Sequence, residues 1–164
     1  MSRLVRRMGW SSLTRTSEAT PVARMPRRHA LFLGLVAVQA AHSVEEYVGR
    51  LWEVFPPATF LTGLISADHE IGFLVINISL ALFGFWAFLW PVRGRWPSAR
   101  AFMWVWVVME LINGIGHPAW ALLQRGYTPG LITAPVLLVL ALLLLRELRS
   151  QPPELVGQPP TESR

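Results

Sequence analysis

The chain contains no cysteine and no lysine. Without cysteine it can form no disulfide and offers no thiolate to a metal, so any metal would take nitrogen and oxygen ligands from His, Glu, Asp or Asn. The 15 basic residues are all arginine, and the formal net charge is +5. These arginines lie in short stretches beside apolar segments, a distribution typical of membrane topology. We therefore expect no nucleic-acid partner.

Charged residues are also scarce, at 15% of the 164 residues, whereas hydrophobic residues make up 52%. This composition is too apolar for an ordinary soluble domain of this length. Four apolar stretches approach the roughly 20 residues that cross a bilayer core. They run from about 30 to 51, 70 to 90, 101 to 123 and 131 to 145. The sequence predicts an all-α fold, a four-span transmembrane helical bundle. The use of arginine for every basic residue fits a bacterium, and hence a bacterial plasma membrane.

The segments outside these stretches divide the chain into three parts. They are an Arg-rich arm at 1–28, the four-span domain at 29–147 and a Pro-rich tail at 148–164. The arm and the tail lack apolar periodicity, so we expect both to be disordered. Translation is expected to start at Met1 or at Met25, which stands just before the first apolar stretch. Arginines gather in the arm, in the loop at 93–100 and after the last stretch, so the positive-inside rule predicts that both termini are cytoplasmic.

Prolines mark the expected ends of the apolar stretches. Pro56 and Pro57 are expected to stop the first helix and open a connector with a short amphipathic turn on the membrane. Pro91 is expected to end the second span. The run Tyr127-Thr128-Pro129-Gly130 predicts a tight turn before the last span.

Ionisable residues interrupt the first apolar stretch at His42, Glu45 and Glu46. An ionisable side chain at mid-bilayer costs about 2.5 to 3.5 kcal/mol on insertion scales, so partners, bound ions or protonation must offset the cost. Residues three and four apart lie on the same side of a helix. All three side chains are therefore expected to reach one side of this span.

The third stretch carries a second polar stripe, Glu110, Asn113 and His117, whose spacing places it on one helix face. A helical rise of about 1.5 Å per residue puts this stripe and the first one at the same depth, in the outer half of the bilayer. Asn77 of the second span reaches that level too. We expect the stripes to face each other and form a buried polar site that the hydrophobic fourth span closes against lipid.

Three short motifs occur in order along the chain. They are His42-Ser43-Val44-Glu45-Glu46, Asn113-Gly114-Ile115-Gly116-His117 and Tyr127-Thr128-Pro129-Gly130. In this combination the chain resembles, over about residues 30 to 147, the family of bacterial membrane proteins named for its HXXEE motif. The resemblance implies a small helical membrane domain whose motif residues are functionally important, and it implies no particular reaction. The motif positions that it supports as site residues are His42, Glu45, Glu46, Asn113 and His117.

The leading interpretation is a metal-dependent enzyme that acts on a lipophilic substrate in the membrane. Imidazole and carboxylate ligands suit a divalent metal, namely iron, manganese or zinc. The candidate metal ligands are His42, Glu45, Glu46, Glu110 and His117. The candidate catalytic groups are Glu45, Glu46 and Glu110 as acids or bases, with Asn113 to orient ligand or substrate.

Other interpretations stay open. A metal-free enzyme could use a protonated Glu and a neighbouring base to isomerise or cyclise a terpene-like or sterol-like lipid. The polar residues could also form a network that only locks the helices of a non-catalytic bundle. An ion or proton pathway is disfavoured because residues 30 to 38 and 101 to 109 carry no charge to continue it. Membrane lipid and a lipophilic small molecule are the expected partners, and the sequence does not indicate an oligomeric state.

Overall fold

The computed structural model describes residues 25–150, and within that range all regular secondary structure is helical. The helices are α1 Arg27–Val48, α2 Leu51–Val54, α3 Pro56–Ile65, α4 His69–Ala87 with the π-helical turn η1 Phe88–Val92, α5 Ala99–Gln124 and α6 Ala134–Ser150. The all-α prediction is therefore confirmed. The arm and the tail that were predicted to be disordered lie almost wholly outside the described residues. The helical domain extends slightly past its predicted limits of 29 and 147 at both ends.

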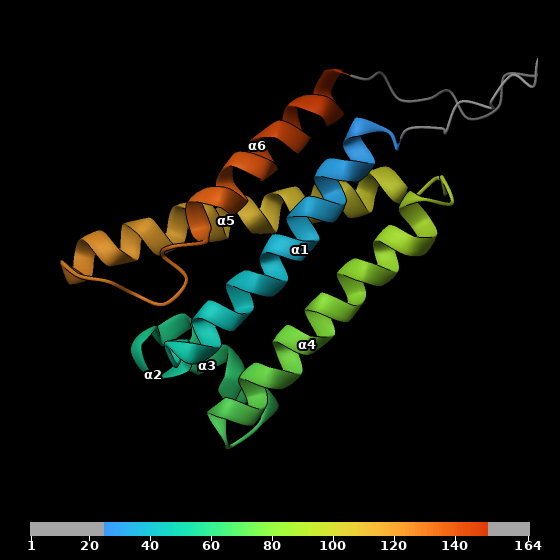
Figure 1. Cartoon of the computed structure of the whole chain (residues 1–164). Coiled ribbons are helices and arrows are strands. Elements are labelled where there is room, and N and C mark those ends of the chain that lie inside the picture. Colours follow the sequence, from blue (N-terminus) through green and yellow to red (C-terminus); the bar gives the residue numbers. More distant parts are fainter. Residues whose placement is uncertain (1–24, 151–164) are drawn as a thin grey trace, which may run out of the picture.

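Helices α1, α4 and α5 are the long elements, the shorter α6 lies beside α1 and α5, and the short helices α2 and α3 lie together at one end (Figure 1). Helix α1 packs against α4 and α6, and α6 packs against α5. Arg27 and Glu147 lie 3.7 Å apart, and Arg100 donates a hydrogen bond of 2.6 Å to the carbonyl of Leu148. These contacts join the start of α1, the start of α5 and the end of α6. The opposite end holds α2, α3 and the loop between α5 and α6.

A hydrophobic core fills the half of the bundle near the start of α1. It is formed by apolar side chains of α1, α5 and α6 with the π-helical turn, among them Phe32, Leu35, Val36, Val92, Met103, Trp106, Val107, Leu137 and Leu144. The predicted site residues of α1 and α5 come later in both helices. The core therefore fixes the two helices against each other and leaves the polar site in the other half.

Prolines were expected to end helices at Pro56 and at Pro91, and the structure differs from this expectation at both positions. Phe55 is extended and ends α2, but Pro56 then occupies the first position of α3, where its fixed φ suits a helix start. The connector thus consists of two short helices. Pro91 does not end the second helix, because the chain widens into the π-helical turn around it and continues to Val92.

Many apolar side chains point away from the bundle. Among them are Phe60 and Leu64 of α3, Ile78 and Leu82 of α4, Ile112 and Leu122 of α5 and Val139 of α6. Among the described helices, the continuous helix His69–Val92 has 24 residues and is long and apolar enough to cross a membrane.

Candidate functional site

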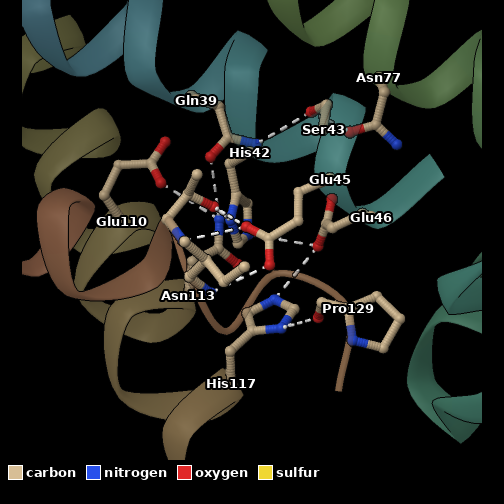
Figure 2. Close-up of polar contacts among 12 residues, drawn as sticks. Gln39, His42, Ser43, Glu45, Glu46, Asn77, Glu110, Asn113, His117 and Pro129 are labelled. Carbon is tan, nitrogen blue, oxygen red and sulfur yellow. Dashed lines mark hydrogen bonds and ion pairs between the residues drawn. The ribbon is translucent and has the colours of Figure 1, made fainter. Parts of the chain in front are cut away.

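Two histidines and one glutamate converge between α1 and α5 (Figure 2). His42 and Glu46 stand one turn apart on α1, and His117 faces them from α5. The Nε2 atoms of His42 and His117 lie 3.3 and 3.1 Å from the same oxygen, Oε1 of Glu46. All three side chains are buried, and His42 is fully enclosed. Their ligand atoms lie within 4.8 Å of one another, so the group could hold a metal ion.

Hydrogen bonds on the far side of each ring assign the tautomers. His117 Nδ1 lies 2.8 Å from the carbonyl oxygen of Pro129. A carbonyl oxygen only accepts hydrogen bonds, so Nδ1 of His117 carries a proton and donates it. A neutral His117 ring therefore presents the lone pair of its Nε2 to Glu46.

The His42 ring is assigned in the same way, through a hydroxyl group. Its Nδ1 lies 2.6 Å from Oγ1 of Thr133, and that hydroxyl donates a hydrogen bond of 2.6 Å to Oε2 of Glu45. Because the hydroxyl proton is used on Glu45, the Thr133 oxygen accepts the proton of His42 Nδ1. Within the described chain, His42 Nε2 makes no hydrogen bond, although it lies close to Glu46.

Three electron-pair donors thus face one another in a buried position. Two imidazole Nε2 atoms and one carboxylate oxygen converge, and in these tautomers none of them brings a proton to the others. Lone pairs in such proximity repel unless a cation lies between them, and burial strengthens the repulsion. The arrangement requires either a metal ion or an additional proton.

Glu45, the neighbour of Glu46 in the motif, points toward the loop between α5 and α6. Its carboxylate accepts hydrogen bonds from the Tyr127 hydroxyl (2.9 Å), the Ile132 N–H (3.0 Å), the Thr133 N–H (2.9 Å) and the Thr133 hydroxyl (2.6 Å). Its oxygens are therefore engaged outside the group that could hold a metal. This loop, rather than α6 itself, covers the histidines.

Gly130 lets the loop lie directly on the two histidine rings. Its φ is +89°, and a Cβ built on it would lie 2.6 Å from His117 Cε1 and 2.7 Å from His42 Cε1. A residue with a side chain would be strained here and would collide with both rings. The turn that the sequence predicted at 127–130 is thus part of the site.

Glu110 and Asn113 lie in a separate polar layer with Gln39. Glu110 is fully buried, and Asn113 Nδ2 donates a hydrogen bond of 3.2 Å to its Oε2. Turning the Gln39 amide over from the orientation drawn in Figure 2 places its nitrogen 2.8 and 3.2 Å from the two Glu110 oxygens, where it donates to the carboxylate. At this level Ser43 also donates a hydrogen bond of 2.7 Å to Asn77 of α4, so α4 reaches the polar layer.

The predicted site residues therefore form three sets. His42, Glu46 and His117 come together, Glu45 holds the loop, and Glu110 pairs with Asn113. Sequence reasoning missed the contributions of Pro129 and Thr133. A backbone carbonyl leaves no signal in a sequence, and a threonine at the start of an apolar helix is more commonly a cap.

A polar pocket and an apolar pocket open at the same end of the molecule. The apolar pocket, of about 520 Å³, adjoins the site because Pro129, which holds His117, is part of its wall. Val54 and Trp120 add apolar lining, whereas Gln124, Tyr127 and Thr128 add polar groups. The ring of Phe55 stands between Trp120 and His117, with centroids 5.2 and 6.2 Å away. The covered histidines therefore lie next to an open space with a mixed lining that is more apolar than polar.

A comparison with known protein families finds a family model that is named for the HXXEE motif. Residues 33–145 match the family model described as "Protein of unknown function with HXXEE motif". No curated protein and no solved structure matches the chain. The matched region begins in α1 and ends in α6, so it includes every residue of the site. The chain belongs to the family of proteins of unknown function with an HXXEE motif.

Proposed function

We propose that this chain is a membrane-embedded enzyme of the bacterial plasma membrane in which His42, Glu46 and His117 hold one divalent metal ion next to a lipophilic substrate. The observation that carries the proposal is the convergence of two imidazole Nε2 atoms and one carboxylate oxygen in a buried position, with both Nδ1 atoms bonded to other groups. A metal ion would neutralise Glu46 and use both free Nε2 lone pairs at once. It would also offset the cost of burying the carboxylate.

The membrane part of the proposal rests on the lengths and surfaces of the helices. Helices α1 and α5 have 22 and 26 residues, and a rise of about 1.5 Å per residue makes both at least as long as the roughly 30 Å bilayer core. Exposed apolar side chains on α4, α5 and α6 would then face lipid. With Arg27, Arg100 and the end of α6 at one end of the bundle, we place that end, and both termini, in the cytoplasm.

The donor set narrows the choice of metal. Two histidines and one carboxylate form the ligand set of several zinc hydrolases and of the iron(II) oxygenases, and three protein ligands leave positions open for water or substrate. We therefore place zinc and iron ahead of manganese. The metal, when bound, would supply Lewis acidity and polarise a substrate oxygen.

Residues of this chain would supply the remaining functions. The loop between α5 and α6 excludes water from the histidines and holds both rings by their Nδ1 atoms. The apolar pocket beside Pro129 would receive the apolar body of the substrate. Glu110 is a fully buried carboxyl group near the site, and its partner Asn113 would keep it oriented as a proton donor or acceptor.

Elemental analysis of detergent-purified protein tests the proposal. The wild type should hold about one zinc or iron per chain, and His42→Ala and His117→Ala should lose it. His69→Ala is the matched control, because His69 bonds Thr62 at the same end of the bundle but lies outside the group. Wild type and control should retain equal metal.

A metal-free wild type with both alanine variants folded would contradict the proposal. A proton would then occupy the space between the three donors. An acid/base isomerase or cyclase acting on a terpene-like or sterol-like lipid, or a non-catalytic polar network, would account for the site instead.

A further inference from the structure

We infer that Glu45 is a positioning residue: through the hydroxyl of Thr133 it sets the tautomer of His42, and so directs the Nε2 lone pair of that ring into the metal site. The inference rests on the proposed metal function for its purpose. Its geometry and its test, however, concern the metal-free protein. It assigns the two adjacent glutamates of the motif different tasks, with Glu46 as ligand and Glu45 as the group that orients a ligand.

The three groups form a directed chain of hydrogen bonds. Thr133 lies between Glu45 Oε2 and His42 Nδ1, at 2.6 Å from each. A hydroxyl has one proton, and a carboxylate can only accept, so the proton of Thr133 points to Glu45. The Thr133 oxygen is then left as an acceptor, and His42 must place its own proton on Nδ1.

Without this chain the opposite tautomer would be favoured. His42 Nε2 lies 3.3 Å from the Glu46 carboxylate, and a proton on Nε2 would be attracted to that oxygen. The chain from Glu45 therefore keeps His42 in the tautomer whose Nε2 lone pair faces Glu46. A metal ligand needs this tautomer, because only an unprotonated Nε2 can bind a metal.

The loop extends the effect of Glu45 to the second histidine. Glu45 also accepts hydrogen bonds from the backbone N–H groups of Ile132 and Thr133, which hold the loop on α1. The same loop carries Pro129, whose carbonyl receives the Nδ1 proton of His117. The carbonyl that bonds His117 can only accept a hydrogen bond. The hydroxyl that bonds His42 can donate or accept, unless Glu45 fixes the direction of its proton.

Four variants separate this role from simple support of the loop. Thr133→Val removes the hydroxyl but keeps the bonds from the backbone to Glu45, and Glu45→Met removes the carboxylate. Thr133→Ser restores a hydroxyl and is the rescue variant. Tyr127→Phe is the matched control, because it removes a hydrogen bond of 2.9 Å from the other oxygen of the same carboxylate.

The readout is the nitrogen NMR spectrum of metal-free protein labelled at histidine, which reports which ring nitrogen carries the proton. The chain has four histidines, so each signal can be assigned by substituting one ring at a time. We expect Nδ1 of His42 to carry a proton in the wild type, Thr133→Ser and Tyr127→Phe, with the additional proton of the metal-free site on Glu46 or on Nε2 of His117. In Thr133→Val and Glu45→Met the proton should move to Nε2, while His117 stays unchanged in Thr133→Val.

Zinc affinity, measured by competition with a chelator, should follow the tautomer. Loss of a group that orients a histidine ligand typically weakens metal binding by about 10- to 100-fold. We expect this loss in Thr133→Val and Glu45→Met but not in Thr133→Ser or Tyr127→Phe.

Retention of the proton on Nδ1 of His42 in Thr133→Val would overturn the inference, even if Glu45→Met failed to fold. If the wild type binds no zinc but the tautomers change as expected, the proposed function fails and the role of Glu45 stands. If zinc binds at His42 and the tautomer of the His42 ring is the same in wild type and Thr133→Val, the role of Glu45 fails and the metal site stands.

Discussion

Gly130→Ala tests whether the loop rests on the two histidine rings as the structure shows. The added methyl would lie 2.6 Å from two atoms of His117 and 2.7 Å from one atom of His42, closer than atoms pack in proteins. The loop must therefore lift or the rings must turn. Either movement separates an Nδ1 atom from the loop group that binds it.

Two contributions set the size of the effect on stability. A residue with a Cβ in the left-handed region at φ +89° costs roughly 1 to 2 kcal/mol, and an overpacked contact costs about 1 to 3 kcal/mol. The free energy of unfolding should fall by about 2 to 5 kcal/mol, the sum of the two. Zinc affinity should fall by about 10- to 100-fold because the rings lose their orienting partners.

Gly116→Ala is the matched control in the preceding helix. No atom of the described chain lies within 4 Å of the Cβ that it would add, apart from its own helix backbone and chain neighbours. Replacing a glycine inside a helix by alanine should stabilise the protein by about 0.5 to 1 kcal/mol. Metal binding should not change.

Equilibrium unfolding in detergent, followed by circular dichroism, and a zinc competition titration measure both effects. Wild-type stability and wild-type zinc affinity in Gly130→Ala would refute the reasoning, since the loop could not then lie against the rings. Lowered stability with unchanged zinc affinity would show that the loop packs there without orienting the histidines.

Three further outcomes are expected. Glu110→Gln should leave the metal content unchanged, because Glu110 lies outside the group of His42, Glu46 and His117. Loss of metal in this variant would show that Glu110 is a metal ligand. Tyr127 is mostly exposed, and its partial desolvation, followed by the hydrogen bond to Glu45, raises its pKa. Its neutral phenol therefore stabilises the fold below about pH 10, and the stability difference between wild type and Tyr127→Phe should shrink as pH rises past that value. In intact cells, a membrane-impermeant maleimide should label Ala67→Cys but not Ser98→Cys in this cysteine-free chain, and the reverse pattern would contradict the proposed orientation.

The regularity of helices explains how much of the site could be foreseen. Spacings of three, four and seven residues identify side chains on one helix face, and a constant rise gives their depth. These two rules bring His42 and Glu46 of α1 to the level of His117 on α5, where the structure has a buried His/Glu cluster. The same rules place Asn77 at that level, where it accepts a hydrogen bond from Ser43.

Irregular backbone limited the prediction elsewhere. A turn was expected at 127–130, but its path depends on contacts with Glu45 and on a glycine in the left-handed region. Nothing in the sequence shows that a carbonyl of this turn holds His117. The π-helical turn around Pro91 was missed for a similar reason, since a proline ordinarily ends a helix and packing decides whether the chain widens instead.

The sequence by itself determined that the chain is all helical, that His42 shares a helix face with Glu46 as His117 does with Glu110, and that the chain carries the motif of its family. These properties follow from composition and from the helical period, which are local. Only the tertiary structure decided which glutamate joins the histidines. Adjacent residues on a helix point in directions about 100° apart, so the rotation of α1 in the bundle, which long-range packing fixes, turns Glu46 toward His117 and Glu45 toward the loop.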